Sequence, residues 1–386
     1  MSAKNQVPRF ATVEDVITEL KPAYPVYCLR PAELRRQASY FLDSFPGRVM
    51  YAVKCNPHLV VLQALYDAGI RHFDTASLAE IALIREHFPQ ADCYFMHPVK
   101  SRAAIMSASQ VYSVDHFVID HENELDKLIA TTGGGDGQVV LVRIITPVHD
   151  AQYRLSDKFG IAAAAAPELL RKVHEANFQT GVAFHVGSQC RNPQAFVDGV
   201  NTALDVIEAA GVPVHYLDVG GGFPAVYEDD RPPELGRYFD AIAGVFDRSR
   251  LRGDCVLMCE PGRAMVASGC SLLAQVQLRK NDKLYINDGI YQSLSETLLG
   301  KIKLPARLIN PKRSIATECQ DFKIFGPTCD NIDILPTPYY LPVDADEGDW
   351  IEIGQIGAYS NSAATRFNGF FAETFVAVDA PPLMPE

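Results

Sequence analysis

Eight short apolar runs recur between residues 49 and 260, and they alternate with stretches of helical periodicity. The runs occupy residues 49–55, 72–76, 93–97, 116–119, 139–145, 181–187, 214–219 and 255–260. Strands that alternate with helices at this spacing predict parallel β-α units. Eight units over about 215 residues match the size of a (β/α)8 barrel. The rival, an open doubly wound sheet, lacks a G-x-G-x-x-G motif after its first strand.

The alternation stops near Met265, and the rest of the chain has a different character. Strand-like runs at 271–278, 283–286 and 350–353 are separated by turns rich in Pro, Gly and Asp, which predicts a mostly β second domain. A strand near Tyr27 precedes the barrel and is free to pair with that domain. We therefore expect a barrel over residues 30–264, and a discontinuous β-rich domain made of residues 1–29 and 265–386.

The composition of the chain argues against several classes of protein. A chain of 386 residues is long enough for two structural units. A net charge of -12, with no Lys/Arg-rich block, argues against a nucleic-acid partner. The N-terminus lacks the apolar segment of a secretory signal, and no apolar run approaches the roughly 20 residues of a membrane span. Nine cysteines without a C-x-x-C pair fit neither a metal site nor a disulfide framework, so we expect a cytoplasmic protein.

Lys54 lies at the end of the first apolar run, next to the turn signal Asn56-Pro57. A buried ammonium must be paired or lose its proton. A desolvated amine is what Schiff-base chemistry requires. A lysine just past a strand end can also extend into solvent. This stretch alone leaves both interpretations open.

Polar residues at the other strand ends favour the catalytic interpretation, because active sites of β/α barrels gather at the carboxyl ends of the strands. Asp74 ends the second run, His185 lies in the sixth and Glu260 ends the eighth. Taken singly, the histidine could be a buried structural residue and the glutamate half of an ion pair.

A triple glycine at 220–222 follows the seventh run, and Arg263 follows the eighth. Glycines let backbone N–H groups approach an anion closely, and a guanidinium adds a charged fork. A glycine cluster alone marks only a tight turn. A Schiff-base lysine, an acid and a phosphate cradle together match pyridoxal phosphate.

Seven motifs in sequence order carry a resemblance to a known family. They are Y-A-V-K-C-N at 51–56, H-V-G-S-Q at 185–189, G-G-G-F-P at 220–224, E-P-G-R at 260–263, G-P-T-C-D at 326–330, G-A-Y-S at 357–360 and F-N-G-F at 367–370. The chain resembles the fold-type III pyridoxal-phosphate decarboxylases, and most of all the ornithine/lysine decarboxylase branch. The resemblance implies a (β/α)8 barrel of the alanine-racemase type and a mostly β C-terminal domain.

The resemblance also implies residue roles. Lys54 would form the Schiff base, Glu260 would pair with the pyridine nitrogen, and His185 would stack on the ring. The phosphate would be held by Ser188, Gly220, Gly221, Gly222, Arg263 and Tyr359. Other residues near the cofactor would be Asp74, Arg143 and Gly262, with Glu80 more peripheral.

Two further residues are implied for the substrate side of the site. Cys329 corresponds to the cysteine that delivers a proton to the decarboxylated carbon, and a thiol whose pKa is adjusted can do so. Without the motif around it, it would be an inert turn residue. Asp330 corresponds to the carboxylate that contacts the distal amine. In this family the neighbouring subunit supplies both residues, which implies a homodimer with two shared sites.

The segment after N-D-G-I-Y departs from the family pattern. Leu299 or Gly300 stands where ornithine decarboxylases carry a second acidic residue, and Glu296 is the candidate replacement, with Tyr359 as a further substrate contact. A lost charged hydrogen bond costs about 1–3 kcal/mol, enough to change substrate preference. His97-Pro98 also replaces a more usual Asn-Pro.

The expected function is decarboxylation of a basic L-amino acid such as ornithine or lysine, as in polyamine biosynthesis. A different diamino acid in a specialised pathway stays open. Diaminopimelate decarboxylases carry C-E-S after G-P, and alanine racemases carry arginine in place of Glu260. Non-catalytic regulators related to the decarboxylases lose cofactor residues that this chain keeps. Single-barrel pyridoxal-phosphate homeostasis proteins lack a β domain.

Overall fold

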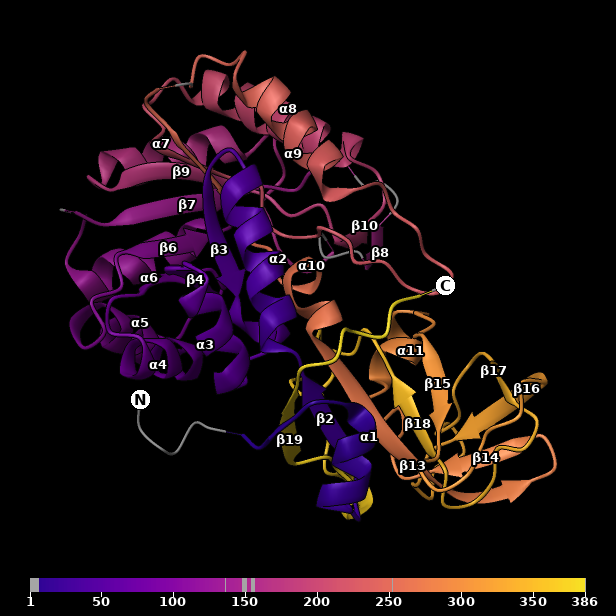
Figure 1. Cartoon of the computed structure of the whole chain (residues 1–386). Helices are drawn as coiled ribbons and strands as arrows, with labels where there is room; N and C mark the ends of the chain where they lie inside the picture. The colour runs from indigo at the N-terminus through magenta and orange to yellow at the C-terminus, as the bar shows by residue number, and fades with distance from the viewer. Residues whose placement is uncertain (1–6, 136, 148–150, 154–156, 252, 386) are drawn as a thin grey trace.

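Eight parallel strands close into a barrel in the computed structural model, which describes residues 7–135, 137–147, 151–153, 157–251 and 253–385 (Figure 1). The strands are β3 (Arg48–Ala52), β4 (His72–Thr75), β5 (Asp92–Phe95), β6 (His116–Ile119), β7 (Val139–Arg143), β9 (Gln179–Ala183), β11 (Tyr216–Asp218) and β12 (Val256–Cys259). Their order around the barrel is β11-β12-β3-β4-β5-β6-β7-β9. The predicted (β/α)8 barrel is confirmed, and each strand falls within or beside its predicted apolar run.

Helices pack around the outside of the barrel. They are α2 (Pro31–Ser44), α3 (Leu59–Asp67), α4 (Leu78–His87), α5 (Arg102–Gln110), α6 (Glu122–Thr132), α7 (Ala166–Glu175), α8 (Gln194–Ala210) and α9 (Leu235–Phe246). Local signals set their ends: Pro31 opens α2, and the Ser77 hydroxyl accepts the Glu80 N–H at the start of α4. Among the described residues, no helix has both the length and the apolar character needed to cross a membrane.

A second, mixed sheet of nine strands draws on both ends of the chain (Figure 1). Its strands are β1 (Arg9–Phe10), β2 (Val26–Leu29), β13 (Cys270–Lys280), β14 (Lys283–Ile286), β15 (Ala306–Ile309), β16 (Cys319–Phe325), β17 (Tyr339–Pro342), β18 (Trp350–Ile353) and β19 (Thr374–Val378). The early strand β2 pairs antiparallel with β13 and parallel with β19. The predicted β-rich region is therefore present, and it includes the N-terminal segment. The domain boundaries at residues 30 and 264 stay a prediction.

The remaining elements are short. They are α1 (Val13–Asp15), a π-helical turn (Val16–Leu20), α10 (Arg263–Val266), α11 (Ser295–Leu299), three 3-10 turns (Val53–Cys55, Ala267–Gly269 and Phe367–Gly369), and the strands β8 (Ala151–Tyr153) and β10 (Ser188–Cys190), which form a separate antiparallel pair. Residues 13–20 form an α-helical turn that continues as a π-helical turn.

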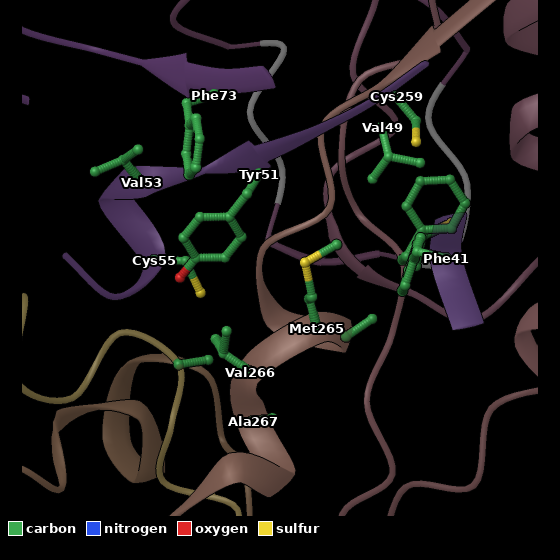
Figure 2. Packing of buried hydrophobic residues seen from close by; sticks show 14 of the residues in the cluster. Phe41, Val49, Tyr51, Val53, Cys55, Phe73, Cys259, Met265, Val266 and Ala267 are labelled. Atoms are coloured by element: carbon green, nitrogen blue, oxygen red, sulfur yellow. The ribbon is translucent and has the colours of Figure 1, made fainter. Parts of the chain in front are cut away.

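One continuous hydrophobic core runs from the barrel's outer layer into the second sheet. In Figure 2, Met265 and Val266 of α10 lie below Tyr51 of β3 and Cys55 of the turn after it, and Phe41 of α2 belongs to the same cluster. Because α10 leads through a 3-10 turn into β13, this packing fixes the barrel mouth against the second sheet.

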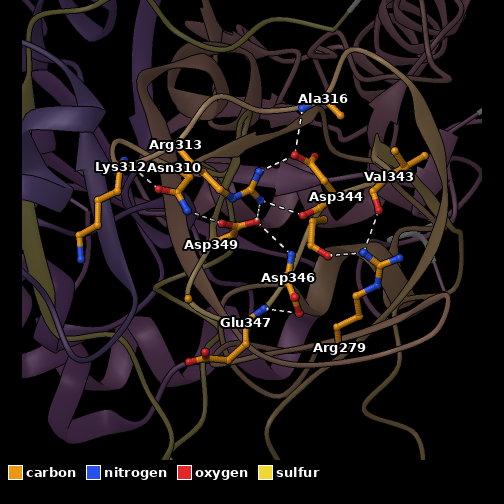
Figure 3. A network of polar contacts seen from close by, with 12 residues as sticks. Arg279, Asn310, Lys312, Arg313, Ala316, Val343, Asp344, Asp346, Glu347 and Asp349 are labelled. Carbon is orange, nitrogen blue, oxygen red and sulfur yellow. Dashed lines mark hydrogen bonds and ion pairs between the residues drawn. The ribbon is translucent and has the colours of Figure 1, made fainter.

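A polar network stabilises the far end of the second sheet (Figure 3). The Arg313 guanidinium forms ion pairs with Asp344, at 2.5 Å, and with Asp349, whose side chain is only 2% exposed. Asn310 Nδ2 also donates to Asp349, at 2.6 Å.

We expect Arg313→Met to lower the free energy of unfolding by about 2 kcal/mol, because it leaves the Asp349 carboxylate buried without its counter-ion. Arg366→Met is the control. Arg366 pairs with Glu373 on the surface, with exposed fractions of 75% and 63%, so its loss should cost under about 0.5 kcal/mol. Equal urea midpoints for the two variants would show that the Arg313 network does not stabilise the fold.

Candidate active site

Lys54 lies at the barrel mouth, in the 3-10 turn that follows β3. The predicted strand over 49–55 is therefore too long: β3 ends at Ala52, because the chain turns at Val53 to enter the loop before α3. The Lys54 amine donates to Asp74 Oδ2 at 2.9 Å, and Asp74 is 1% exposed on neighbouring β4.

The Lys54 amine is ion-paired with Asp74, and its side chain is 41% exposed. Desolvation lowers the pKa of the amine, but the carboxylates of Asp74 and Glu260 raise it by more, and the net pKa lies above the usual value. Lys54 is thus charged at neutral pH and is held by Asp74.

Glu260 follows β12 directly, and its backbone N–H donates to Gly220 O at 2.8 Å. The side chain is nearly buried. Burial raises the pKa of the Glu260 carboxyl well above its usual value, and the nearby carboxyls of Asp218 and Asp74 add to that rise. Lys54 and Arg143, which ends β7, act in the opposite direction. The predicted residues Lys54, Asp74, Arg143 and Glu260 thus share one electrostatic environment.

His185 lies in the loop after β9, which ends at Ala183, so this predicted strand is also too long. The ring Nδ1 accepts a hydrogen bond from Gly187 N–H at 3.0 Å, so Nε2 carries the proton. Burial lowers the pKa of His185 well below its usual value, and the Arg143 and Lys54 cations lower it further. The imidazole is therefore neutral at neutral pH.

The glycine loop 220–222 packs against the His185 loop. Gly220 has φ +68, and a Cβ there would lie 2.1 Å from Phe184 O. Gly222 has φ +104, and a Cβ there would lie 2.2 Å from Gly187 O. No residue other than glycine fits either position. A Cβ on Gly221 would lie 3.0 Å from His185 Nε2, which places the imidazole beside this loop.

Arg263 begins α10 and is 3% exposed. Its Nε and Nη2 each lie 3.4 Å from Ser188 Oγ, its Nη1 donates to Tyr227 Oη at 3.0 Å, and its guanidinium carbon lies 5.1 Å from the Tyr359 ring centroid. Three of the residues predicted to hold phosphate therefore meet here. Tyr359 has φ +57, a conformation that is uncommon outside glycine and that concentrates at functional sites.

Glu296, from α11, contacts this arginine. Its Oε2 pairs with Arg263 at 2.6 Å, and its Oε1 accepts from Tyr153 Oη at 2.6 Å. A Cβ on Gly300 would lie 2.5 Å from the same tyrosine oxygen. Tyr153 therefore occupies the space that a larger residue at position 300 would need. The predicted role of Glu296 in substrate binding stays a prediction, and both of its oxygens already have partners.

Cys329 and Asp330 lie in the loop after β16, in the second sheet. Cys329 is exposed, and its N–H donates to Asn368 Oδ1 at 3.1 Å. Asp330 Oδ2 accepts from Tyr291 Oη at 2.7 Å. These contacts join the two residues to neighbouring loops of the same sheet. Both residues line a surface groove together with Tyr285, Phe325 and Phe370.

The residues at the barrel mouth fit pyridoxal phosphate. An amine, a carboxyl and a neutral imidazole stand near one another, and an arginine with a serine hydroxyl lies beside a loop of glycines. This is the donor set that the cofactor requires.

The match with a family model decides the matter, since residues 31–267 match the model described as "Pyridoxal-dependent decarboxylase, pyridoxal binding domain". The chain belongs to the family of fold-type III pyridoxal-phosphate-dependent ornithine, lysine and arginine decarboxylases. The lysine/ornithine decarboxylase of Selenomonas ruminantium is 32% identical over 86% of this chain and 84% of its own length. Antizyme inhibitor 2 of Xenopus laevis is also 32% identical, over 86% of this chain and 75% of its own length.

The fold of this decarboxylase-family chain agrees with a solved relative. The lysine/ornithine decarboxylase of Vibrio vulnificus, crystallised with putrescine, superposes with a TM-score of 0.82 at 28% identity. The match covers 95% of this chain and 96% of the Vibrio chain.

Sequence analysis of this family member missed three residues that organise the site. Asp218 ends β11, two residues before Gly220 of the triple glycine, and its place at a strand end was the available signal. Asp333 accepts the N–H groups of Ile290 and Thr328, at 2.9 and 3.0 Å, and so joins the G-P-T-C-D loop to the N-D-G-I-Y loop. Tyr153 lies on the three-residue strand β8, which is too short to give a periodic signal.

Glu296→Gln separates two roles for this carboxylate. We expect the variant to bind pyridoxal phosphate about 3- to 10-fold more tightly, because removing a negative charge beside Arg263 strengthens the attraction of a phosphate dianion. The amide can still accept from Arg263 and donate to Tyr153. The KM for the amino acid should change less than about two-fold. A KM raised about ten-fold with cofactor affinity unchanged would instead place Glu296 on the substrate.

Proposed function

We propose that this chain is an active pyridoxal-phosphate-dependent decarboxylase, which converts a basic L-amino acid of the ornithine or lysine type to its amine and CO2. The observation that carries the proposal is the convergence of Lys54, His185, Glu260 and Arg263 at the carboxyl ends of the barrel strands. Such a set, with both the lysine and the acid kept, is what this chemistry needs.

When bound, pyridoxal phosphate supplies an electron sink for the pair of electrons left behind as the substrate carboxyl departs. Lys54 would provide the amine that joins the cofactor aldehyde, and Asp74 holds that amine at 2.9 Å. Glu260 would keep a proton on the pyridine nitrogen, and the neutral His185 ring would cover one face. Arg263, Ser188, Tyr359 and the glycine loop would bind the phosphate.

The substrate side of the proposed site requires a second copy of the chain. Cys329 would deliver a proton to the carbon that loses CO2, and Asp330 would bind the distal amine. Cys329 is exposed, and the groove that it lines carries aromatic side chains, as a surface covered by a partner would. We therefore propose a homodimer in which each barrel mouth is completed by the partner's loop after β16.

The substrate is an open part of the proposal. Asp330 would be one carboxylate for the distal amine, and Leu299 or Gly300 stands where relatives of the ornithine branch carry another. The binding of an ornithine-like dication would lose about 1–3 kcal/mol unless Glu296 or another group compensates. The Selenomonas and Vibrio relatives support lysine or ornithine, with polyamine formation as the consequence. The alternative is the same chemistry on a modified or different diamino acid.

A second candidate function is a decarboxylase-like regulator that does not turn over substrate. The similarity to antizyme inhibitor 2 favours it. The presence of Lys54, Glu260 and Cys329 favours the enzyme. The cysteines of the described residues form no disulfide, which supports a reducing compartment such as the cytoplasm for either function.

The test is CO2 release by the protein loaded with pyridoxal phosphate. The panel contains ornithine, lysine, arginine, 2,4-diaminobutyrate, diaminopimelate and carboxynorspermidine, and Lys54→Ala is the inactive control. The proposal predicts release from ornithine or lysine. Release only from another member would keep the chemistry and change the substrate. Bound cofactor without release from any member would favour the regulator.

A further inference from the structure

Asp218 is a fully buried carboxyl group at the end of β11, inside the barrel mouth. Its Oδ1 accepts the Gly220 N–H at 2.9 Å, and its backbone carbonyl accepts the Phe184 N–H at 3.0 Å. Its Oδ2 is buried and, among the described residues, has no N–H or O–H donor. A buried carboxylate oxygen without a donor is costly, so its surroundings require an explanation.

The Glu260 carboxyl faces Asp218, and a side-chain hydrogen bond between the two groups lowers the pKa of Asp218. Two carboxylates are both acceptors, so this bond exists only when one of the two groups carries a proton. The strand geometry brings the pair together, because Asp218 lies opposite Met258 in the β11–β12 ladder and Glu260 follows β12. The Glu260 N–H also donates to Gly220 O, and the Gly220 N–H donates to Asp218 Oδ1, so Gly220 links the two acidic residues.

The charges around the pair also favour one retained proton. Lys54 comes from the turn after β3, Asp74 from β4, and Arg143 from β7. The Cys259 thiol lies beside the pair on β12, and burial raises its pKa well above the usual value, so it is neutral. His185 is neutral as well. Three carboxyl groups thus face two cations, and one proton on the Asp218–Glu260 pair makes the group neutral. Burial raises the pKa of Asp218 to about 6, in agreement with this count.

We infer that Asp218 is a positioning residue for Glu260, and that the two carboxyl groups share one proton at neutral pH. The bond holds the Glu260 carboxyl in a fixed orientation and stores a proton beside it. The inference rests on the proposed function in one respect: the group that Glu260 faces would be the pyridine nitrogen of the cofactor. There, Glu260 would present a proton to the nitrogen, and the negative charge of Asp218 would keep it there.

Asp218→Asn is the variant that tests the shared proton. The amide oxygen can still accept from Gly220, and its NH2 group can donate to Glu260. Glu260 is then satisfied as a carboxylate, and the pair needs no proton. Asp120→Asn is the matched control, because Asp120 follows β6 and its Oδ2 accepts the N–H of a loop glycine, Gly160, at 2.8 Å.

The first readout is the infrared C=O stretch of protonated carboxyl groups at pH 7, measured without cofactor. We expect the wild-type protein to show one protonated carboxyl that is lost in both Asp218→Asn and Glu260→Gln and is kept in Asp120→Asn. Difference spectra between variants cancel the contribution of Asp288, another carboxyl whose pKa burial raises, to about 7. A band that persists in either pair variant would overturn the inference, since a role limited to packing moves no such band.

The second readout uses protein loaded with pyridoxal phosphate. The absorbance of the bound cofactor would report the protonation of its pyridine nitrogen. Asp218→Asn should lower the pH midpoint of that absorbance change by at least about one unit, because the negative charge of Asp218 no longer stabilises the proton. An unchanged midpoint would contradict the inference. Failure of the wild-type protein to bind the cofactor would contradict the proposed function. The infrared band would still show whether Asp218 and Glu260 share a proton.

Discussion

Lys54→Ala is expected to lower the rate of CO2 release by on the order of 10⁴-fold or more, the scale on which enzymes lose activity with their covalent nucleophile. Lys54 is the lysine held at the barrel mouth by Asp74, at 2.9 Å. Its amine is the group that would bond to the cofactor aldehyde. Without it the phosphate contacts of Arg263 and Ser188 remain, so the variant should still bind pyridoxal phosphate reversibly.

The measurement combines CO2 release with the fate of the cofactor after borohydride reduction and dialysis. Wild-type protein should keep the cofactor covalently, and Lys54→Ala should lose it. Lys172→Ala is the control, because Lys172 pairs with Glu122 on the outer surface of the barrel and should behave as the wild type does. Covalent cofactor in Lys54→Ala would mean that another lysine carries it, and the assignment of the site would be wrong.

Cys329→Ala is expected to lower CO2 release by about 10²–10⁴-fold, the usual contribution of a positioned general acid. Cys319→Ala on the same strand-and-loop segment is the control and should retain activity. The proposed dimer adds a stronger prediction. Mixing Lys54→Ala with Cys329→Ala should restore activity to about a quarter of the wild type, because half of the reassorted dimers are mixed and each mixed dimer has one intact site.

In the matched control for the mixing experiment, a double variant with both Lys54→Ala and Cys329→Ala takes the place of the Cys329→Ala variant. Lys54→Ala mixed with the double variant contains no intact site and should stay inactive. If the single variants fail to complement while both exchange subunits, Cys329 acts within its own chain and the shared site is wrong.

The sequence predicts the barrel well because its strands are short apolar runs and its helices have clear ends. Each of the eight runs overlaps one barrel strand, and the stretches of helical periodicity between most of them form helices around the barrel. The runs overestimate strand length at Lys54 and His185, because buried turn residues such as Val53 and Val186 are as apolar as the strand before them. An apolar residue indicates that the position is buried, but it does not show that the residue pairs within a strand.

The sequence predicts individual residues of the candidate site only where they lie in a recognisable motif. Lys54, His185, Glu260 and Arg263 converge as expected. The partners of Arg263 could not be predicted, because Tyr153 and Glu296 are 143 residues apart in the sequence and meet only when β8 and α11 have folded together. The sequence places Asp218 close to the triple glycine, but the buried Asp218 Oδ2 that lacks a donor is apparent only from the structure.

The most direct test of the central claim is proton NMR of the product formed from lysine or ornithine in D2O by the wild-type protein loaded with pyridoxal phosphate. Decarboxylation replaces the departing carboxyl by one solvent-derived hydron, so the account predicts a diamine with a single deuterium on the carbon that lost CO2. Recovery of the amino acid with deuterium at Cα, and no diamine, would show cofactor chemistry without decarboxylation and would contradict the account.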